Sequence, residues 1–180
     1  MATPERDILR NELRWGAVMG LLVAGILGLI IYAALALHIS PPSNVEFIDP
    51  KTLQLSGEFT EQNLGTQVSG DDSVVVRIVA TQYEFLPQCV AVPLNRPVTL
   101  RLASPDVIHG FLIAGTNVNT MVVPGYVSQV HATFTKPGET LMPCHEFCGL
   151  GHSAMLARVR VLPADQFKPD AQGRVSCAQH

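Results

Sequence analysis

The residues best suited to chemistry lie in one short segment, from Pro143 to Met155. Its sequence, Pro-Cys-His-Glu-Phe-Cys-Gly-Leu-Gly-His-Ser-Ala-Met, brings two cysteines, two histidines and a methionine close together. Cys144, Cys148, His152 and Met155 follow the spacing Cys-x3-Cys-x3-His-x2-Met. Soft thiolate and thioether ligands favour copper, whereas thiolate and imidazole ligands alone also suit zinc. The segment is therefore a candidate metal-binding loop.

Three interpretations of the cysteine pair are open. Cys144 and Cys148 could form a disulfide, contribute half of a zinc site, or bind copper. A structural zinc site usually adds a second pair of ligands from a separate knuckle, and the sequence contains no second Cys-x2-4-Cys pair. Zinc would also leave Met155 unexplained, because Zn²⁺ has little use for a thioether. Copper accounts for the methionine.

The second cysteine favours two copper ions over one. A mononuclear blue-copper site needs two histidines, one cysteine and a weak methionine, which would leave Cys148 unused. Two thiolates can instead each bridge two metals that share one unpaired electron. His152 and a distant histidine would cap one copper each, with Met155 and the main-chain carbonyl of Glu146 as weaker ligands. Such a closed ligand set suits electron transfer rather than chemistry on a bound substrate.

The distant histidine is predicted to be His109. It lies where an extended segment should begin, and Asp106 three residues earlier could orient its neighbours. His131 falls on the polar face of an expected strand, so solvent should surround it, and His145 should point outward because only the backbone is needed there. The predicted metal ligands are His109, Cys144, Glu146 through its carbonyl oxygen, Cys148, His152 and Met155.

The elements that must position these residues are short β-strands. Residues 98–102 and 130–134 alternate apolar and polar side chains, as half-buried strands do. Pro124-Gly125 and Pro137-Gly138 supply turns, and no helical period of useful length appears here. The pattern predicts an antiparallel sandwich or barrel over residues 73–162. Strands are expected over residues 74–80, 98–102, 107–113, 118–123, 130–134 and 155–162.

The N-terminal part is predicted to be a membrane anchor. Residues 15–37 form an apolar run with no Asp, Glu, Lys or Arg, and a helix of that length rises roughly 34 Å, enough to cross the hydrocarbon core, so a transmembrane helix is predicted over residues 15–38. Trp15 and Tyr32 lie towards its ends, where amphipathic rings prefer to sit. A cleaved signal peptide is the alternative, but the run exceeds the usual apolar length and no small-x-small cleavage site clearly follows it.

The distribution of basic residues predicts which end of this anchor faces the cytoplasm. Arg6, Arg10 and Arg14 precede the span, and the first basic residue after it is Lys51. The positive-inside rule therefore places residues 1–14 in the cytoplasm and the later chain on the periplasmic or extracellular side of the cell membrane. Residues 39–72 are expected to be a linker, and residues 163–180 a polar C-terminal extension.

The length and net charge of the chain limit the number of domains and the classes of partner that it can have. With 180 residues, the chain suits one domain of ordinary size plus accessory segments. The 12 basic residues against 15 acidic ones give a net charge of −3, which excludes the strongly basic class of nucleic-acid-binding proteins.

Several motifs together resemble subunit II of the haem–copper cytochrome c oxidases. They are Ser104-Pro105-Asp106-Val107-Ile108-His109-Gly110, Gly115-Thr116-Asn117, Pro124-Gly125, Pro137-Gly138 and the Cys144–Met155 loop. The resemblance covers residues 15–162, and the single membrane span is similar to the short subunit II of the B-family oxidases.

This resemblance implies a cupredoxin-like Greek-key sandwich behind a single transmembrane helix, with a dinuclear copper A centre. It implies an electron-accepting subunit that takes electrons from cytochrome c and passes them to a haem in subunit I, where oxygen is reduced to water. The same six residues are then the copper ligands. The alternatives are a copper A subunit of another respiratory reductase, such as a nitric oxide reductase, or a non-redox membrane-anchored metal-binding sandwich.

Two features depart from the family pattern. The aromatic cluster through which A-family members accept electrons is missing, and only Tyr83 and Phe85 lie in the comparable stretch. Cys89, Cys177 and the tail after Leu162 have no counterpart. A disulfide between the two cysteines could pin the tail to the sandwich in an oxidising compartment.

Overall fold

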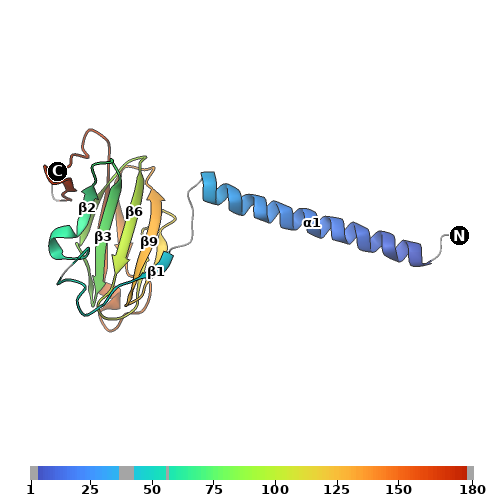
Figure 1. Ribbon diagram of the computed structural model, residues 1–180, viewed down its shortest axis with the longest axis horizontal. Helices are drawn as coiled ribbons and strands as arrows, with labels where there is room; N and C mark the ends of the chain where they lie inside the picture. Colours follow the sequence, from blue (N-terminus) through green and yellow to red (C-terminus); the bar gives the residue numbers. More distant parts are fainter. Residues whose placement is uncertain (1–3, 37–42, 56, 178–180) are drawn as a thin grey trace. The chain divides into compact units, whose positions relative to one another are not determined.

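The computed structural model describes residues 4–36, 43–55 and 57–177. The chain divides into two units, one up to residue 39 and the other from residue 40 onward. The first unit contains helix α1 and the second contains the β-strands, as Figure 1 shows.

The helix α1 spans Pro4–Ala36. Its first turn carries Glu5 and Asp7, whose charges suit the positive end of the helix dipole, and Asp7 pairs with Arg10 at 3.2 Å. From Trp15 onward the helix is apolar, and its length and composition make it a candidate membrane span. The predicted span of residues 15–38 agrees with the helix as far as Ala36, and its last two positions lie outside the described residues.

Within the described residues, the second unit contains twelve strands, in two larger sheets and one small one. The strands are β1 (Ser43–Phe47), β2 (Gly65–Val68), β3 (Val74–Thr81), β4 (Glu84–Leu86), β5 (Cys89–Pro93), β6 (Pro97–Ala103), β7 (His109–Leu112), β8 (Asn119–Val122), β9 (Tyr126–Thr133), β10 (Gly138–Pro143), β11 (Leu156–Leu162) and β12 (Arg174–Val175). Short 3-10 turns occupy Glu61–Asn63 and His152–Ala154.

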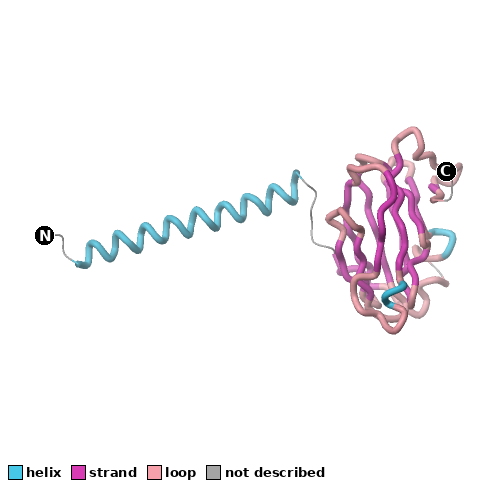
Figure 2. Tube along the Cα trace, turned by 180° about the vertical axis from the view of Figure 1, so that it is seen from behind, coloured by secondary structure: helices cyan, strands magenta, loops and turns pink. Residues whose placement is uncertain are grey.

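The larger sheet has the order β1-β9-β6-β3-β2-β12, with β4 added beside β3. Figure 1 shows β2, β3, β6, β9 and β1 side by side. The second sheet has the order β10-β11-β5, and β7 pairs with β8 separately. Figure 2, from behind, shows strands making up most of this unit. The predicted all-β sandwich behind a single N-terminal apolar helix is confirmed.

The strand directions differ from the expected antiparallel pattern. β3 runs parallel to β6, and β11 runs parallel to β5. After β4, the chain crosses to the other sheet as β5 before it returns as β6, so β3 and β6 point the same way. Parallel neighbours require such crossovers, whereas a hairpin joins antiparallel ones.

Part of the predicted linker belongs to the sandwich. β1 pairs with β9 and β2 pairs with β3, so both strands extend the larger sheet. Between them, Leu53 and Phe59 are fully buried in a small core cluster against Val79 and Val127. The sequence did not predict these two strands, because both are short and are surrounded by polar turn residues.

The predicted C-terminal extension also packs on the sandwich. Phe167 and Val175 belong to the main core, and β12 pairs with β2. Cys177 forms a disulfide with Cys89 at the start of β5, with the two Cα atoms 5.8 Å apart. The structure thus contains the disulfide that the sequence allowed.

The main core lies between the two larger sheets and continues to the metal-binding loop. Ile78 and Leu100 from one sheet and Val159 from the other are fully buried, and each such side chain stabilises the fold by about 1.5–3 kcal/mol. Phe85 packs edge to face on Phe111, with ring centroids 5.6 Å apart. Cys144, Cys148 and Met155 belong to the same buried cluster. The candidate ligands are therefore held at one end of the packed core.

Candidate metal centre

The imidazole of His109 is buried and oriented from behind. His109 is the first residue of β7 and has no solvent exposure. Its Nε2 lies 2.9 Å from Oδ1 of Asp106, while its Nδ1 faces Sγ of Cys144 at 3.9 Å. A carboxylate on one ring nitrogen holds a proton there and leaves the other nitrogen free to bind a metal.

Asp106 is itself fixed by several donors. The backbone N–H groups of Gln82 and Val107 donate to its carboxylate at 2.7 and 2.6 Å, and the Thr81 hydroxyl donates at 2.9 Å. Burial raises the pKa of the Asp106 carboxyl, but the hydrogen bonds from His109 and these backbone groups outweigh it and lower the pKa to about 2. Asp106 is therefore charged at neutral pH, and the predicted orienting role agrees with its geometry.

The two sulfur atoms at the centre of the site are free thiols. Cys144 and Cys148 are buried, and their Sγ atoms lie 3.8 Å apart. Cys144 follows β10, and its N–H donates to the carbonyl of Met155 at 3.0 Å, which ties the two ends of the loop together. The carbonyl oxygen of Glu146 lies 3.3 Å from Sγ of Cys144.

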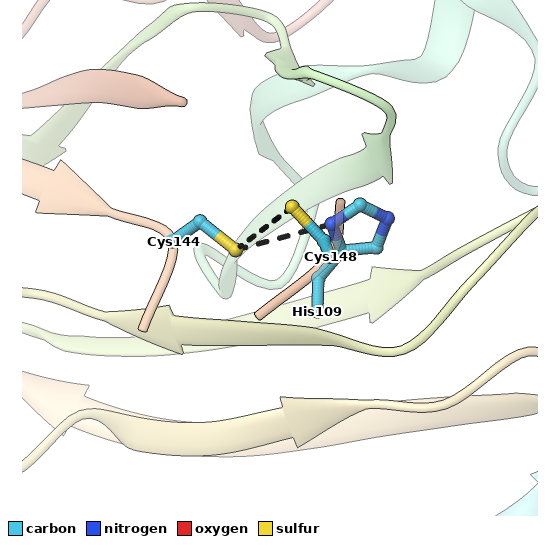
Figure 3. A group of neighbouring side chains, drawn as sticks. All are labelled: His109, Cys144 and Cys148. Carbon is cyan, nitrogen blue, oxygen red and sulfur yellow. Dashed lines mark hydrogen bonds between the residues drawn. The ribbon is translucent and has the colours of Figure 1, made fainter. Parts of the chain in front are cut away.

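The remaining two candidate ligands approach Cys148. Nδ1 of His152 and Sδ of Met155 each lie 3.7 Å from its Sγ. Met155 is buried, whereas His152, in the 3-10 turn after Gly151, is partly exposed. The structure thus brings together all six residues predicted as ligands, from segments that are far apart in the sequence. Figure 3 shows three of these residues, the buried His109, Cys144 and Cys148, with the His109 ring and the Cys148 thiol directed toward the thiol of Cys144.

The chemistry of this donor set fits copper. Burial raises the pKa of the Cys148 thiol to about 11, and the hydrogen bond and charge of Cys144 add to the effect. Two thiolates this close in an apolar core therefore need a cation to stabilise them. Two thiols, two imidazoles and a thioether are soft or intermediate ligands, which copper prefers. His109, Cys144 and Cys148 alone place their ligand atoms within 4.8 Å of one another.

Two other histidines lie away from the centre, as predicted. His131 is exposed on β9, where its ring contacts the Thr99 hydroxyl and the Gln129 amide, both at 3.2 Å. His145 is exposed although it lies between the two cysteines, and its backbone N–H donates to the carbonyl of Gly110 at 3.2 Å.

The sequence did not single out the contacts of the turn between β3 and β4. The side-chain amide of Gln82 donates to the carbonyl of Cys148. The ring of Tyr83 lies over Gly151, where an added Cβ would come within 2.5 Å of Tyr83 Cγ. Only the absence of a side chain allows this approach. No local motif marks these contacts, because they join residues more than sixty positions apart in the chain.

The comparisons with known proteins agree with this geometry. A family model described as the periplasmic domain of cytochrome c oxidase subunit II matches residues 69–162. A cytochrome c oxidase subunit 2 of Thermus thermophilus is 34% identical over 159 residues, covering 87% of this chain and 94% of that protein. A second Thermus thermophilus cytochrome c oxidase subunit 2 is 36% identical over 121 residues, covering 67% of this chain and 90% of that protein.

A solved structure extends the similarity to the arrangement of the chain. One chain of a heme-copper terminal oxidase dimer is 31% identical, with a TM-score of 0.66. The match covers 84% of this chain and 99% of that one. Because the domain, the overall length and the β-sandwich all match, this chain belongs to the cytochrome c oxidase subunit II family.

Proposed function

We propose that this chain is the electron-accepting subunit of a membrane-bound terminal oxidase and that its loop holds a dinuclear copper A centre. The observation that carries the proposal is the pair of buried free thiols, 3.8 Å apart and surrounded by two imidazoles and a thioether. A single blue copper would use one cysteine, and this site presents two.

Each residue has a role in this proposal. Cys144 and Cys148 would hold the metals through their thiolates, and His109 and His152 would provide one nitrogen each. Met155 and the carbonyl of Glu146 would be the weaker ligands. When bound, the copper pair supplies a one-electron redox site. The surrounding chain keeps the ligands in place, because Asp106 fixes His109 and the bond from the Cys144 N–H to Met155 closes the loop.

Burial of the ligands supports electron transfer rather than substrate chemistry. His109, Cys148 and Met155 are nearly or fully inaccessible to solvent, and they lie in the packed core. Packed side chains and fixed hydrogen bonds limit how far the ligands can move when the charge of the site changes. The chain therefore supplies a packed cage in which these three ligands have little access to solvent.

One side of the cage reaches the surface through His152. The ring of Phe147 lies 5.9 Å from the ring of His152, and Phe147 and Leu150 are 72% and 98% exposed. Exposed apolar groups beside a redox ligand suit brief contact with a protein partner. We infer that cytochrome c or a similar donor delivers electrons to this centre, which passes them to a haem in subunit I, where oxygen is reduced to water.

The helix α1 anchors the subunit in the cell membrane in this proposal. Arg6, Arg10 and Arg14 precede the apolar part of the helix, so residues 1–14 lie in the cytoplasm. The copper domain then lies on the periplasmic or extracellular side, where a soluble electron donor can reach it.

The second cysteine provides the direct test. The full-length chain is purified in detergent, loaded with copper and analysed for copper per chain, alongside Cys148→Ser and the control His131→Gln. We expect two coppers in the wild type and in His131→Gln, because His131 is distant from the site. Cys148→Ser should lose the dinuclear centre, and two tightly bound coppers in that variant would refute the proposed bridge.

A further inference from the structure

The turn between β3 and β4 contacts both halves of the metal centre. It contains two residues, Gln82 and Tyr83, between the paired residues Thr81 and Glu84. The turn lies directly against the metal-binding loop, since a Cβ added to Gly149 would come within 2.8 Å of Gln82 Nε2 and 2.7 Å of the Tyr83 hydroxyl. The two residues of a tight hairpin turn therefore make this contact with the loop.

Gln82 contacts the His109 segment through its backbone N–H and the Cys148 loop through its side-chain amide. Its backbone N–H donates to Oδ2 of Asp106 at 2.7 Å, and Oδ1 of the same carboxylate holds Nε2 of His109 at 2.9 Å. Its side-chain amide donates to the main-chain carbonyl of Cys148. One residue thus connects the segment that carries the first imidazole to the loop that carries the second thiol.

The connection matters because these two ligands have no short covalent link. His109 begins β7, whereas Cys148 lies in the loop between β10 and β11. Their relative position depends on the contacts between the two segments, and ligand geometry is sensitive to small displacements. A hydrogen bond to a loop carbonyl also limits the local opening of that loop.

We propose that Gln82 is a positioning residue of the metal centre, which sets the separation of the His109 and Cys148 ligands through its two hydrogen bonds. The side-chain bond fixes the Cys148 peptide, and the backbone bond fixes Asp106 and through it His109. The part of this inference that concerns bound copper rests on the proposed function. The part that concerns the position of the thiol does not.

The test uses the full-length chain in detergent and three variants. Gln82→Met keeps the length of the side chain and removes its donor. Gln82→Glu keeps the shape and turns a carboxylate oxygen toward the Cys148 carbonyl. Gln88→Met is the matched control, because Gln88 is also a glutamine of this region and its side-chain amide contacts Glu84 at 3.2 Å, away from the loop.

The first measurement needs no metal. The alkylation rate of Cys148 by iodoacetamide is followed by peptide mass spectrometry in copper-free protein that retains the Cys89–Cys177 disulfide. Losing one hydrogen bond that holds the loop should raise this rate about fivefold in Gln82→Met. The increase should be larger in Gln82→Glu, and Gln88→Met should match the wild type. Equal rates in Gln82→Met and Gln88→Met would overturn the proposal.

The second measurement follows copper loading. Gln82→Met should bind as much copper as the wild type but show shifted sulfur-to-copper absorption bands, because one thiolate has moved relative to one imidazole. An unchanged spectrum in the loaded Gln82→Met protein would also overturn the proposal. If the wild type bound no copper, the proposed function would fail, and the alkylation rates alone would decide the role of Gln82.

Discussion

Gly110 allows the segment after Cys144 to lie directly against β7. A Cβ added at Gly110 would come within 2.5 Å of the backbone nitrogen of Glu146 and 2.6 Å of the backbone carbon of His145. Both contacts are with backbone atoms, which cannot rotate away as a side chain can. Gly110 follows His109 directly, so this close approach brings the backbone at His145 and Glu146 against the residue next to the first imidazole.

Replacing Gly110 by alanine should therefore displace the loop. We expect Gly110→Ala to lower the free energy of unfolding by about 1–3 kcal/mol, the usual effect of forcing an extra carbon into a packed site. It should also reduce the copper bound per chain. Thermal unfolding of the copper-free protein and metal analysis measure the two effects. Gly70→Ala is the control, since nothing lies within 4 Å of a Cβ there. Similar behaviour of the two variants would contradict the argument.

The sequence could predict a candidate ligand set because the spacing of Cys144, Cys148, His152 and Met155 restricts the chemistry strongly, and the structure places these side chains close together. Even the distant His109 could be inferred, since the loop lacked one imidazole and Asp106 marked a nearby orienting group. Gln82 was missed for a physical reason. A glutamine in a turn has many possible partners, and only the folded chain shows that its amide meets the Cys148 carbonyl.

Among the elements, the C-terminal segment joins the edges of the two sheets. β12 pairs with β2 of the larger sheet, while Cys177 is bonded to Cys89 on β5 of the other. A guanidinium N–H of Arg160 on β11 donates to the Cys177 carbonyl at 2.9 Å. The segment thus covers a sheet edge that would otherwise expose unpaired backbone groups.

Removing this disulfide should lower the free energy of unfolding of the sandwich without changing the candidate metal centre. The bond joins residues 88 positions apart, and loss of such a bond typically costs about 2–5 kcal/mol. We expect the double variant Cys89→Ser with Cys177→Ser to unfold at lower temperature in calorimetry. Its absorption after copper loading should match the wild type. An unchanged unfolding temperature, or a lost copper spectrum, would show that the disulfide has a different role.

The strands differ in how well the sequence predicts them. Residues 97–102 of β6, 129–133 of β9 and 156–161 of β11 alternate between more exposed and buried side chains, which is the period-two pattern of a strand. β2 and β12 have only four and two residues, so their side chains give too little pattern. The pairing of β5 with β11 depends on contacts between distant segments, which no local pattern reveals.

At the scale of the whole β unit, a charged network covers the outer face of the larger sheet. Arg77 on β3 lies beside Arg101 on β6, and both donate to Glu58 from the segment between β1 and β2. Arg101 also pairs with Glu46 of β1 at 2.7 Å. The network connects β1, β3, β6 and the segment between β1 and β2, and its two carboxylates balance two adjacent positive charges.

The network gives stability a dependence on pH. Burial raises the pKa of Glu58, but the hydrogen bonds and charges of Arg101 and Arg77 outweigh it, so the pKa lies below its ordinary value of 4.5. Its contribution is therefore complete above about pH 4.5 and is lost as pH falls toward the lowered pKa. Glu58→Gln should be less stable at pH 7, by on the order of 1–3 kcal/mol, because two charge-assisted contacts weaken.

Denaturant unfolding between pH 7 and pH 3 measures this difference. The wild type should lose more stability than Glu58→Gln below pH 4.5, so that the two curves converge in acid. Glu61→Gln is the control for the removal of an exposed carboxylate, since Glu61 accepts the Leu64 N–H at 3.3 Å through its backbone carbonyl and not through its side chain. Parallel curves for wild type and Glu58→Gln would contradict the role of the network.

For the molecule as a whole, we propose that one loop and one distant histidine hold two coppers that share an electron. EPR spectroscopy of the full-length chain, loaded with copper and purified in detergent, tests it most directly. We expect a hyperfine pattern from a single unpaired electron distributed over two equivalent copper nuclei, with two coppers per chain. A pattern from a single copper nucleus, or a colourless protein without an EPR signal after loading, would contradict it.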